Sequence, residues 1–125
     1  MADFDVVTFG ETMLRLSPPD HKQIEQASQF NFFAGGTESN LAVGLARLGA
    51  RVAWFSRLPD NPLGHVVINA VRQHNVDTSH VILTDDGRMG LYFAEEHLPP
   101  RAISVIYDRA HSSMSRMGPD DIPEA

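Results

Sequence analysis

Short apolar runs, separated by polar turns and glycines, follow one another along the first third of the chain. Residues 5–9 (DVVTF) are β-prone and end in Gly10, which is typical of a buried first strand. Residues 13–16 predict a further short strand, which two prolines interrupt. The aromatic run at 30–33 predicts another strand, and it leads directly into a pair of glycines.

Two amphipathic helices are predicted next. Thr37 is a suitable N-cap for the first, and Gly49 supplies its left-handed stop. Asn61 followed by Pro62 predicts the start of the second, which ends near Asn75. Apolar residues recur at helical spacing in both segments: Leu41, Ala42, Leu45, Ala46 and Leu48 in the first, and Leu63, Val66, Val67, Ala70 and Val71 in the second.

The order of these elements predicts an α/β fold. Residues 52–55 and 81–84 are strand candidates that follow the two helices, and strand–helix–strand is the rhythm of a parallel sheet. The last third differs, because Asp86-Gly87 is a hairpin signal and residues 90–94 and 103–107 predict strands joined by short polar turns. We therefore expect a parallel α/β layer with an antiparallel flap attached.

Composition narrows the class of protein. The 125 residues are 42% hydrophobic and 21% charged, with a mean hydropathy of −0.19, as expected of an ordinary globular domain. A net charge of −6 without any basic run argues against nucleic-acid binding. No run approaches the roughly 20 apolar residues of a membrane span, and the start of the chain lacks a signal-peptide pattern. The absence of cysteine accords with a reducing cytoplasm.

Several common chemical motifs are missing from the sequence. It contains neither the GxxxxGK[ST] nor the GxGxxG phosphate-binding pattern, and it contains no HExxH. The six histidines include no i, i+4 pair, so we expect no metal site. The adjacent acid pairs at 85–86, 95–96 and 120–121 diverge in direction and are interpreted as solvated turns.

The segment from residue 34 to residue 40 (AGGTESN) is the first that can carry chemistry. Gly35 and Gly36 allow a ligand to approach the backbone, and the helix that follows presents free N–H groups. Asn40, in the first turn, can both donate to and accept from a polyol hydroxyl. The alternative is a plain strand-to-helix turn with a cap.

The second such segment lies in the flap. On a strand, Val105, Tyr107 and Arg109 share one face, and a hydroxyl beside a guanidinium suits a small carboxylated ligand. Tyr92, on the other flap strand, is positioned to join them. The alternative is that the tyrosines only pack. Glu11 follows a buried strand at the end where α/β sheets place ligands, and ligand contact and backbone capping both remain open for it.

Five stretches together resemble a known family. AGGTESNLAVGLARLG at 34–49, LPDNPLG at 58–64 and VVTFGET at 6–12 resemble the N-terminal signature of the PfkB/ribokinase carbohydrate kinases. Gly10-Glu11, GLYF at 90–93 and the YDR that ends at Arg109 are most similar to 2-keto-3-deoxygluconate kinases within it. The resemblance covers essentially the whole chain.

The resemblance implies a ribokinase-like fold, with a Rossmann-like sheet and an antiparallel β lid made by residues 12–34 and 88–109. It implies transfer of the ATP γ-phosphoryl group to the primary hydroxyl of 2-keto-3-deoxygluconate or a similar ketoacid or ketose. The lid is also a possible surface for homo-oligomers. Sugar contacts are implied for Gly35, Gly36, Asn40, Tyr92, Tyr107 and Arg109, with Glu11 added as a candidate and Arg109 near the substrate carboxylate.

The sequence departs from the family at two places. Pro59 stands where the family usually has glycine, so that turn must be built differently. The GxGD motif with the catalytic aspartate is absent, so no catalytic residue is assigned in this chain and the site for ATP and Mg²⁺ is expected mostly in a missing C-terminal half. Residues 1–125 then form the N-terminal part of a kinase domain, inactive alone and prone to aggregate.

Other interpretations remain open from sequence. A fructokinase or another sugar kinase of the family is the nearest alternative enzyme. A non-catalytic sugar-binding or dimerising module is the alternative from another functional class, and a remnant without function has the same sequence signature.

Overall fold

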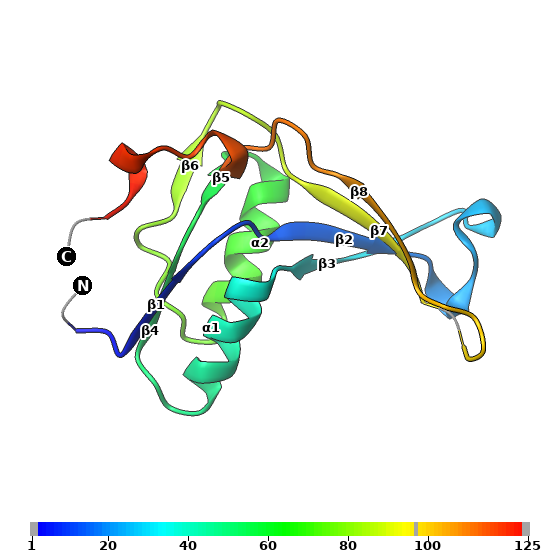
Figure 1. The fold of residues 1–125 in the computed structure, drawn as a ribbon, viewed down its shortest axis with the longest axis horizontal. Helices are drawn as coiled ribbons and strands as arrows, with labels where there is room; N and C mark the ends of the chain where they lie inside the picture. The colour runs from blue at the N-terminus through cyan, green and yellow to red at the C-terminus, as the bar shows by residue number, and fades with distance from the viewer. Residues whose placement is uncertain (1–2, 97, 124–125) are drawn as a thin grey trace.

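The computed structural model describes residues 3–96 and 98–123, and its α/β layer lies at one end of the molecule (Figure 1). The layer contains β1 (Val6–Phe9), α1 (Thr37–Arg47), β4 (Val52–Phe55), β5 (Arg57–Pro59), α2 (Pro62–Arg72) and β6 (Ile82–Thr84). β1 pairs in parallel with β4, and β5 pairs in parallel with β6. The predicted strand–helix–strand order is therefore confirmed, although the three-residue strand β5 was not predicted.

A four-stranded sheet, here called the flap sheet, projects from the α/β layer (Figure 1). Its order is β3-β2-β7-β8, built from β2 (Met13–Ser17), β3 (Asn31–Gly35), β7 (Leu91–Glu95) and β8 (Ser104–Asp108). Single 3₁₀ turns occupy Pro19–His21, Ile24–Gln26, Met114–Arg116 and Pro119–Asp121. Among the described residues, no helix has the length and hydropathy needed to cross a bilayer.

The flap sheet is antiparallel within two strand pairs and parallel between them. β2 pairs with β3 and β7 with β8 in the antiparallel sense, as predicted, whereas β2 and β7 are parallel. β2 follows β1 and β7 follows β6, so both leave the layer in the same direction. The hairpin predicted at Asp86-Gly87 is wrong, because the strands on its two sides belong to different sheets. Gly87 does adopt a left-handed conformation there, with φ of +93°.

The hydrophobic core lies between the two helices and one face of the parallel strands. Trp54, Leu58 and Val67 are almost completely buried in it. The other face of β1 is open, since Phe9 is 53% exposed while its ring stacks on Phe55 at 5.0 Å. Parallel sheets are usually covered on both faces, whereas this apolar face has no cover among the described residues.

Arg57 ties the end of the described chain to the parallel strands. Its side chain, 16% exposed, lies 3.2 Å from Asp121 and 3.5 Å from Asp86, and it donates to the backbone carbonyl of Arg116. Arg116 also pairs with Asp86, and Glu96 pairs with Arg15. The interpretation of the acid pairs as solvated turns is therefore wrong for Asp86, Glu96 and Asp121, which bind arginines far away in the sequence. Asp85 and Asp120 are exposed, as predicted.

The strand position of Pro59 explains how the chain accommodates proline there. The backbone N–H of Asp60 donates to the Thr84 carbonyl at 2.9 Å, so the bond from this end of β5 to β6 comes from the residue after the proline. Proline lacks an N–H, and at this place none is needed to join β5 to β6.

The two helix starts differ in a way that predicts different mutational effects. Asn61 caps α2, since its side-chain oxygen accepts from the N–H groups of Leu63 at 3.0 Å and Gly64 at 3.1 Å. Thr37 was predicted to cap α1, but the N-cap is Gly36 and Thr37 is the first helical residue. The first turn of α1 is instead fixed by tertiary hydrogen bonds.

We expect Asn61→Ala to lower the free energy of unfolding by about 1 kcal/mol, the usual cost of losing a side-chain cap. Thr37→Ala is the matched control and is expected to change the free energy by less than about half of that amount, because no cap is lost. Urea denaturation followed by circular dichroism measures both. Equal losses in the two variants would contradict this account of the caps.

Candidate functional site

A cavity of about 410 Å³ lies at the carboxyl end of β1 and at the start of α1, beneath the flap sheet. Open α/β sheets place their ligands at this end of the strands. The cavity is lined by every residue that the sequence and the resemblance nominated: Glu11, Gly35, Gly36, Asn40, Tyr92, Tyr107 and Arg109. We call it the carboxyl-end cavity.

The floor of the cavity is held by hydrogen bonds between the β1–β2 connection and the first turn of α1. The hydroxyl of Thr12, which is fully buried, donates to the Ser39 hydroxyl at 2.7 Å, and Ser39 donates to the carbonyl of Gly36. The Thr8 hydroxyl donates to the Glu38 carbonyl at 3.1 Å. These bonds fix the orientation of Asn40 relative to the strands.

The two glycines have a structural role that the sequence did not reveal. A Cβ at Gly35 would overlap the hydroxyl of Tyr92, and a Cβ at Gly36 would lie 2.7 Å from both the Glu11 carbonyl and the Thr12 hydroxyl. At both glycines, atoms of the protein itself therefore occupy the space that a side chain would need. Gly35, on β3, makes room for the hydroxyl end of the Tyr92 side chain, which comes from β7, and Gly36 allows α1 to start against the β1–β2 connection.

The flap sheet contributes one face to the cavity. Tyr92 and Tyr107 are register partners on β7 and β8, with ring centroids 5.9 Å apart. The guanidinium of Arg109 lies 6.0 Å from the centroid of the Tyr107 ring. Val105, Tyr107 and Arg109 all line the cavity, which confirms the prediction that they share a face.

Glu11 contacts Arg109. Its Oε1 lies 2.5 Å from the Nη2 of Arg109, and the Glu11 side chain is 10% exposed whereas that of Arg109 is 49% exposed. The sequence left open whether Glu11 contacts a ligand or caps the backbone, and the structure shows instead that it pairs with Arg109. Among the described residues, Arg109 is the only cation that lines this cavity, and Glu11 is its counter-ion.

Sequence reasoning missed three polar or flexible residues at the cavity. Thr37, Glu38 and Met13 line it as well. The carboxylate of Glu38 lies against Gly10, where a Cβ would come within 2.5 Å of it. The signal was available, because Glu38 stands between Gly36 and Asn40 in the motif. Within residues 3–96 and 98–123, the side-chain amide of Asn40 has no hydrogen-bond partner and stays available to a ligand.

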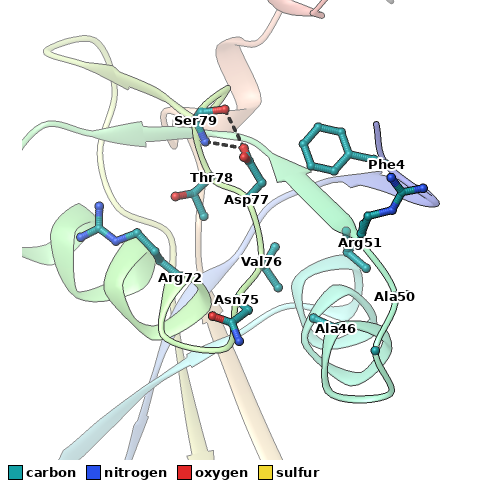
Figure 2. A pocket seen from close by; sticks show the side chains of 12 residues that line it. Phe4, Ala46, Ala50, Arg51, Arg72, Asn75, Val76, Asp77, Thr78 and Ser79 are labelled. Atoms are coloured by element: carbon teal, nitrogen blue, oxygen red, sulfur yellow. Dashed lines mark hydrogen bonds between the residues drawn. The ribbon is translucent and has the colours of Figure 1, made fainter. Parts of the chain in front are cut away.

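A larger cavity, of about 840 Å³, lies at the opposite, amino end of β1 and β4 (Figure 2). Each charged group that lines it has a partner of its own: Arg51 lies 2.9 Å from Asp5, Arg72 donates to the side-chain oxygen of Asn69, and Asp77 accepts from the Ser79 hydroxyl and N–H. The Arg51 side chain lowers the pKa of Asp5, and the Ser79 hydrogen bonds lower that of Asp77. None of the nominated residues lies there, so we place the candidate site at the carboxyl-end cavity.

The described part of the chain contains no group of three or more His, Cys, Asp or Glu side chains arranged to hold a metal ion. His97, one of the six histidines, lies outside the described residues. The carboxyl-end cavity presents a guanidinium, carboxylates, an amide and hydroxyls, which suit a polyhydroxylated ligand that carries a carboxylate.

Comparison with known proteins gives consistent matches. Residues 3–121 match the model of the pfkB family of carbohydrate kinases. The chain is 47% identical over 118 residues to a 2-dehydro-3-deoxygalactonokinase of Haloferax volcanii, covering 94% of this chain and 37% of that protein. It is 33% identical over 123 residues to a 5-dehydro-2-deoxygluconokinase of Clostridium perfringens, covering 97% and 36%.

A solved structure extends the likeness to three dimensions. The 2-dehydro-3-deoxygluconokinase of Thermotoga maritima superposes with a TM-score of 0.91 at 43% identity, over 94% of this chain and 36% of that one. The predicted ribokinase-like arrangement is confirmed by this likeness. The chain spans a little over a third of the length of each of these three proteins.

Proposed function

Because the chain belongs to the pfkB family of carbohydrate kinases, we propose that it forms the sugar-binding part of a kinase for a 2-keto-3-deoxy sugar acid such as 2-keto-3-deoxygluconate. The reaction transfers the γ-phosphoryl group of ATP to the primary hydroxyl of the sugar. The observation that carries the proposal is the convergence of seven nominated residues, from four separate segments, on one cavity. The names of the three relatives support an acid, since each denotes a kinase of a dehydro-deoxy derivative of galactonate or gluconate.

The residues of this chain divide the work of binding. Arg109 pairs with the substrate carboxylate, because no other described residue brings a cation to the cavity and most donors of its guanidinium are not used by Glu11. The Asn40 amide donates to one sugar hydroxyl and accepts from another. Tyr92 and Tyr107 close the flap side of the sugar. Together these contacts hold the substrate in one orientation, and orientation accounts for a large share of phosphoryl-transfer catalysis.

ATP and Mg²⁺ belong to the part of the reaction that these residues do not perform. The described residues offer no metal-holding cluster, and the sequence has no GxGD motif. We therefore propose that both bind elsewhere in the whole protein, and we assign no residue of this chain to them. When bound there, they supply the phosphoryl group and neutralise its charge.

The experiment is a coupled assay of the protein produced from its own gene, with its intact mass measured first. We expect ATP-dependent phosphorylation of 2-keto-3-deoxygluconate or its C4 epimer, with kcat/KM at least about tenfold above that for fructose. Equal or better use of fructose would overturn the sugar-acid assignment and leave a kinase of another sugar. No turnover with any sugar would overturn the kinase proposal.

The purified 125-residue chain is the matched control for this assay. Since no residue in it is assigned to ATP, we expect no detectable turnover by the chain alone. Clean, ATP-dependent and dose-dependent turnover by the purified chain would contradict the placement of the ATP site outside it.

We also propose a self-association surface and a cellular location. The outer part of the flap sheet exposes Phe32 and Ile106, which supports association of two copies through this sheet. The lack of cysteine supports a cytoplasmic location.

A further inference from the structure

The ion pair between Glu11 and Arg109 occupies the group that would bind a substrate carboxylate. The two charged groups are 2.5 Å apart at their nearest atoms. The side chain of Glu11 is almost buried, so its carboxylate forms part of the cavity wall. The side chain of Arg109 is half exposed, so its guanidinium is accessible from the cavity. A carboxylated ligand at Arg109 therefore meets a protein carboxylate that already holds the same guanidinium.

The position of the Glu11 carboxylate is fixed by its surroundings. Gly90 lies directly beside it, since a Cβ at that position would come within 2.9 Å of Oε2. Glu11 is also followed by the fully buried Thr12, whose hydroxyl bonds to Ser39. Arg109, by contrast, follows the last residue of β8, a strand that is exposed along its whole length. A ligand can therefore draw Arg109 away more easily than it can move Glu11.

We propose that Glu11 is a built-in competitor for the ligand carboxylate at Arg109, and that it thereby sets the balance between acidic and neutral sugars. The inference rests on the proposed function, because it needs a ligand carboxylate at Arg109. A neutral sugar leaves the ion pair undisturbed. An acidic sugar must share the guanidinium with Glu11, and its carboxylate lies close to a like charge in a partly enclosed cavity.

The Glu11→Gln variant removes the negative charge at residue 11 but keeps the contact that positions Arg109. Glutamine has nearly the same shape and its amide oxygen still accepts a hydrogen bond from the guanidinium, so Arg109 stays in place while the competing charge is gone. We expect the Kd for 2-keto-3-deoxygluconate to fall about tenfold, as when one of two neighbouring like charges is removed from a partly exposed site. The Kd for fructose is expected to stay within about twofold, since no charge on that sugar meets Glu11.

The test is calorimetric titration of both sugars into the whole protein, with circular dichroism to verify folding of each variant. Glu38→Gln is the matched control, because it removes the same charge from the same cavity without a bond to Arg109. We expect it to change the Kd of the acid by less than about threefold. In an Arg109→Ala background, Glu11→Gln should tighten the acid less, because the two carboxylates have no guanidinium left to compete for and only their mutual repulsion remains.

Each other result overturns the inference. An unchanged or higher Kd for the acid in Glu11→Gln would make Glu11 a positioning residue for Arg109. Equal gains in Glu11→Gln and Glu38→Gln would show a general charge effect. An undiminished gain in the Arg109→Ala background would exclude competition at that guanidinium. Failure of the unmodified protein to bind the acid at all would be different, since it would overturn the proposed function itself.

Discussion

Arg109→Ala is expected to raise the Kd of the whole protein for 2-keto-3-deoxygluconate by about 100-fold, equivalent to roughly 3 kcal/mol. The substitution removes the one guanidinium that residues 3–96 and 98–123 place at the carboxyl-end cavity. It also leaves the Glu11 carboxylate, 10% exposed, without its partner, so the ligand carboxylate would meet an uncompensated like charge. Both consequences act in the same direction, and both act on an acidic ligand far more than on a neutral one.

Calorimetric titration with the acid and with fructose measures this effect. Arg15→Ala is the matched control, since Arg15 also lies on the flap sheet but pairs with Glu96 and does not line the cavity. We expect Arg15→Ala to bind both sugars as the unmodified protein does. Should Arg109→Ala weaken fructose as much as the acid, Arg109 would support the cavity without contacting a carboxylate.

Gly64→Ala is expected to destabilise the fold by at least about 3 kcal/mol, which exceeds the usual cost of overpacking. Gly64 is buried in α2, and a Cβ there would overlap the carbonyl oxygen of Pro59 and lie 3.1 Å from its carbonyl carbon. That carbonyl is held in place, because it accepts from the backbone N–H of Asn61 and stands at the end of β5. Relief would require α2 to move away from the strand.

The sign of this effect is informative, because glycine-to-alanine changes inside helices normally stabilise by about 0.5–1 kcal/mol. Gly44→Ala in α1 is the matched control, since a Cβ at Gly44 would meet nothing within 4 Å. We expect Gly44→Ala to raise the melting temperature and Gly64→Ala to lower it or to abolish folding. Thermal unfolding followed by circular dichroism compares the two, and a Gly64→Ala protein as stable as Gly44→Ala would contradict the close approach of α2 to β5.

Sequence patterns predicted most elements because their causes are local. The helical spacing of apolar residues and the Asn61-Pro62 start define α2, and Gly49, at φ of +96°, ends the segment of α1. Sequence did not predict β5, which has only three residues and ends in proline. The hairpin at Asp86-Gly87 was wrong because a turn signal reports the local backbone, whereas strand pairing is decided by packing.

The candidate site divides in the same way. The motif around Gly36 and Asn40 predicted a ligand site from sequence, since glycines before a helix and an amide in its first turn depend only on neighbouring residues. Its relation to Tyr92 depends on the pairing of β7 with β2, which no local pattern specifies. The ion pair of Glu11 with Arg109 depends on the same flap sheet, because it joins the end of β1 to the end of β8.

The sequence by itself determined the helices, most strands, the family resemblance and the residue types available for binding a sugar. The tertiary structure alone decided which strands pair, which face of the flap sheet points into the cavity, and that Arg109 is already held by Glu11. The reason is physical. Helix periodicity and capping are set by neighbours within a few residues, whereas strand pairing and ion pairs join groups that only chain folding brings together.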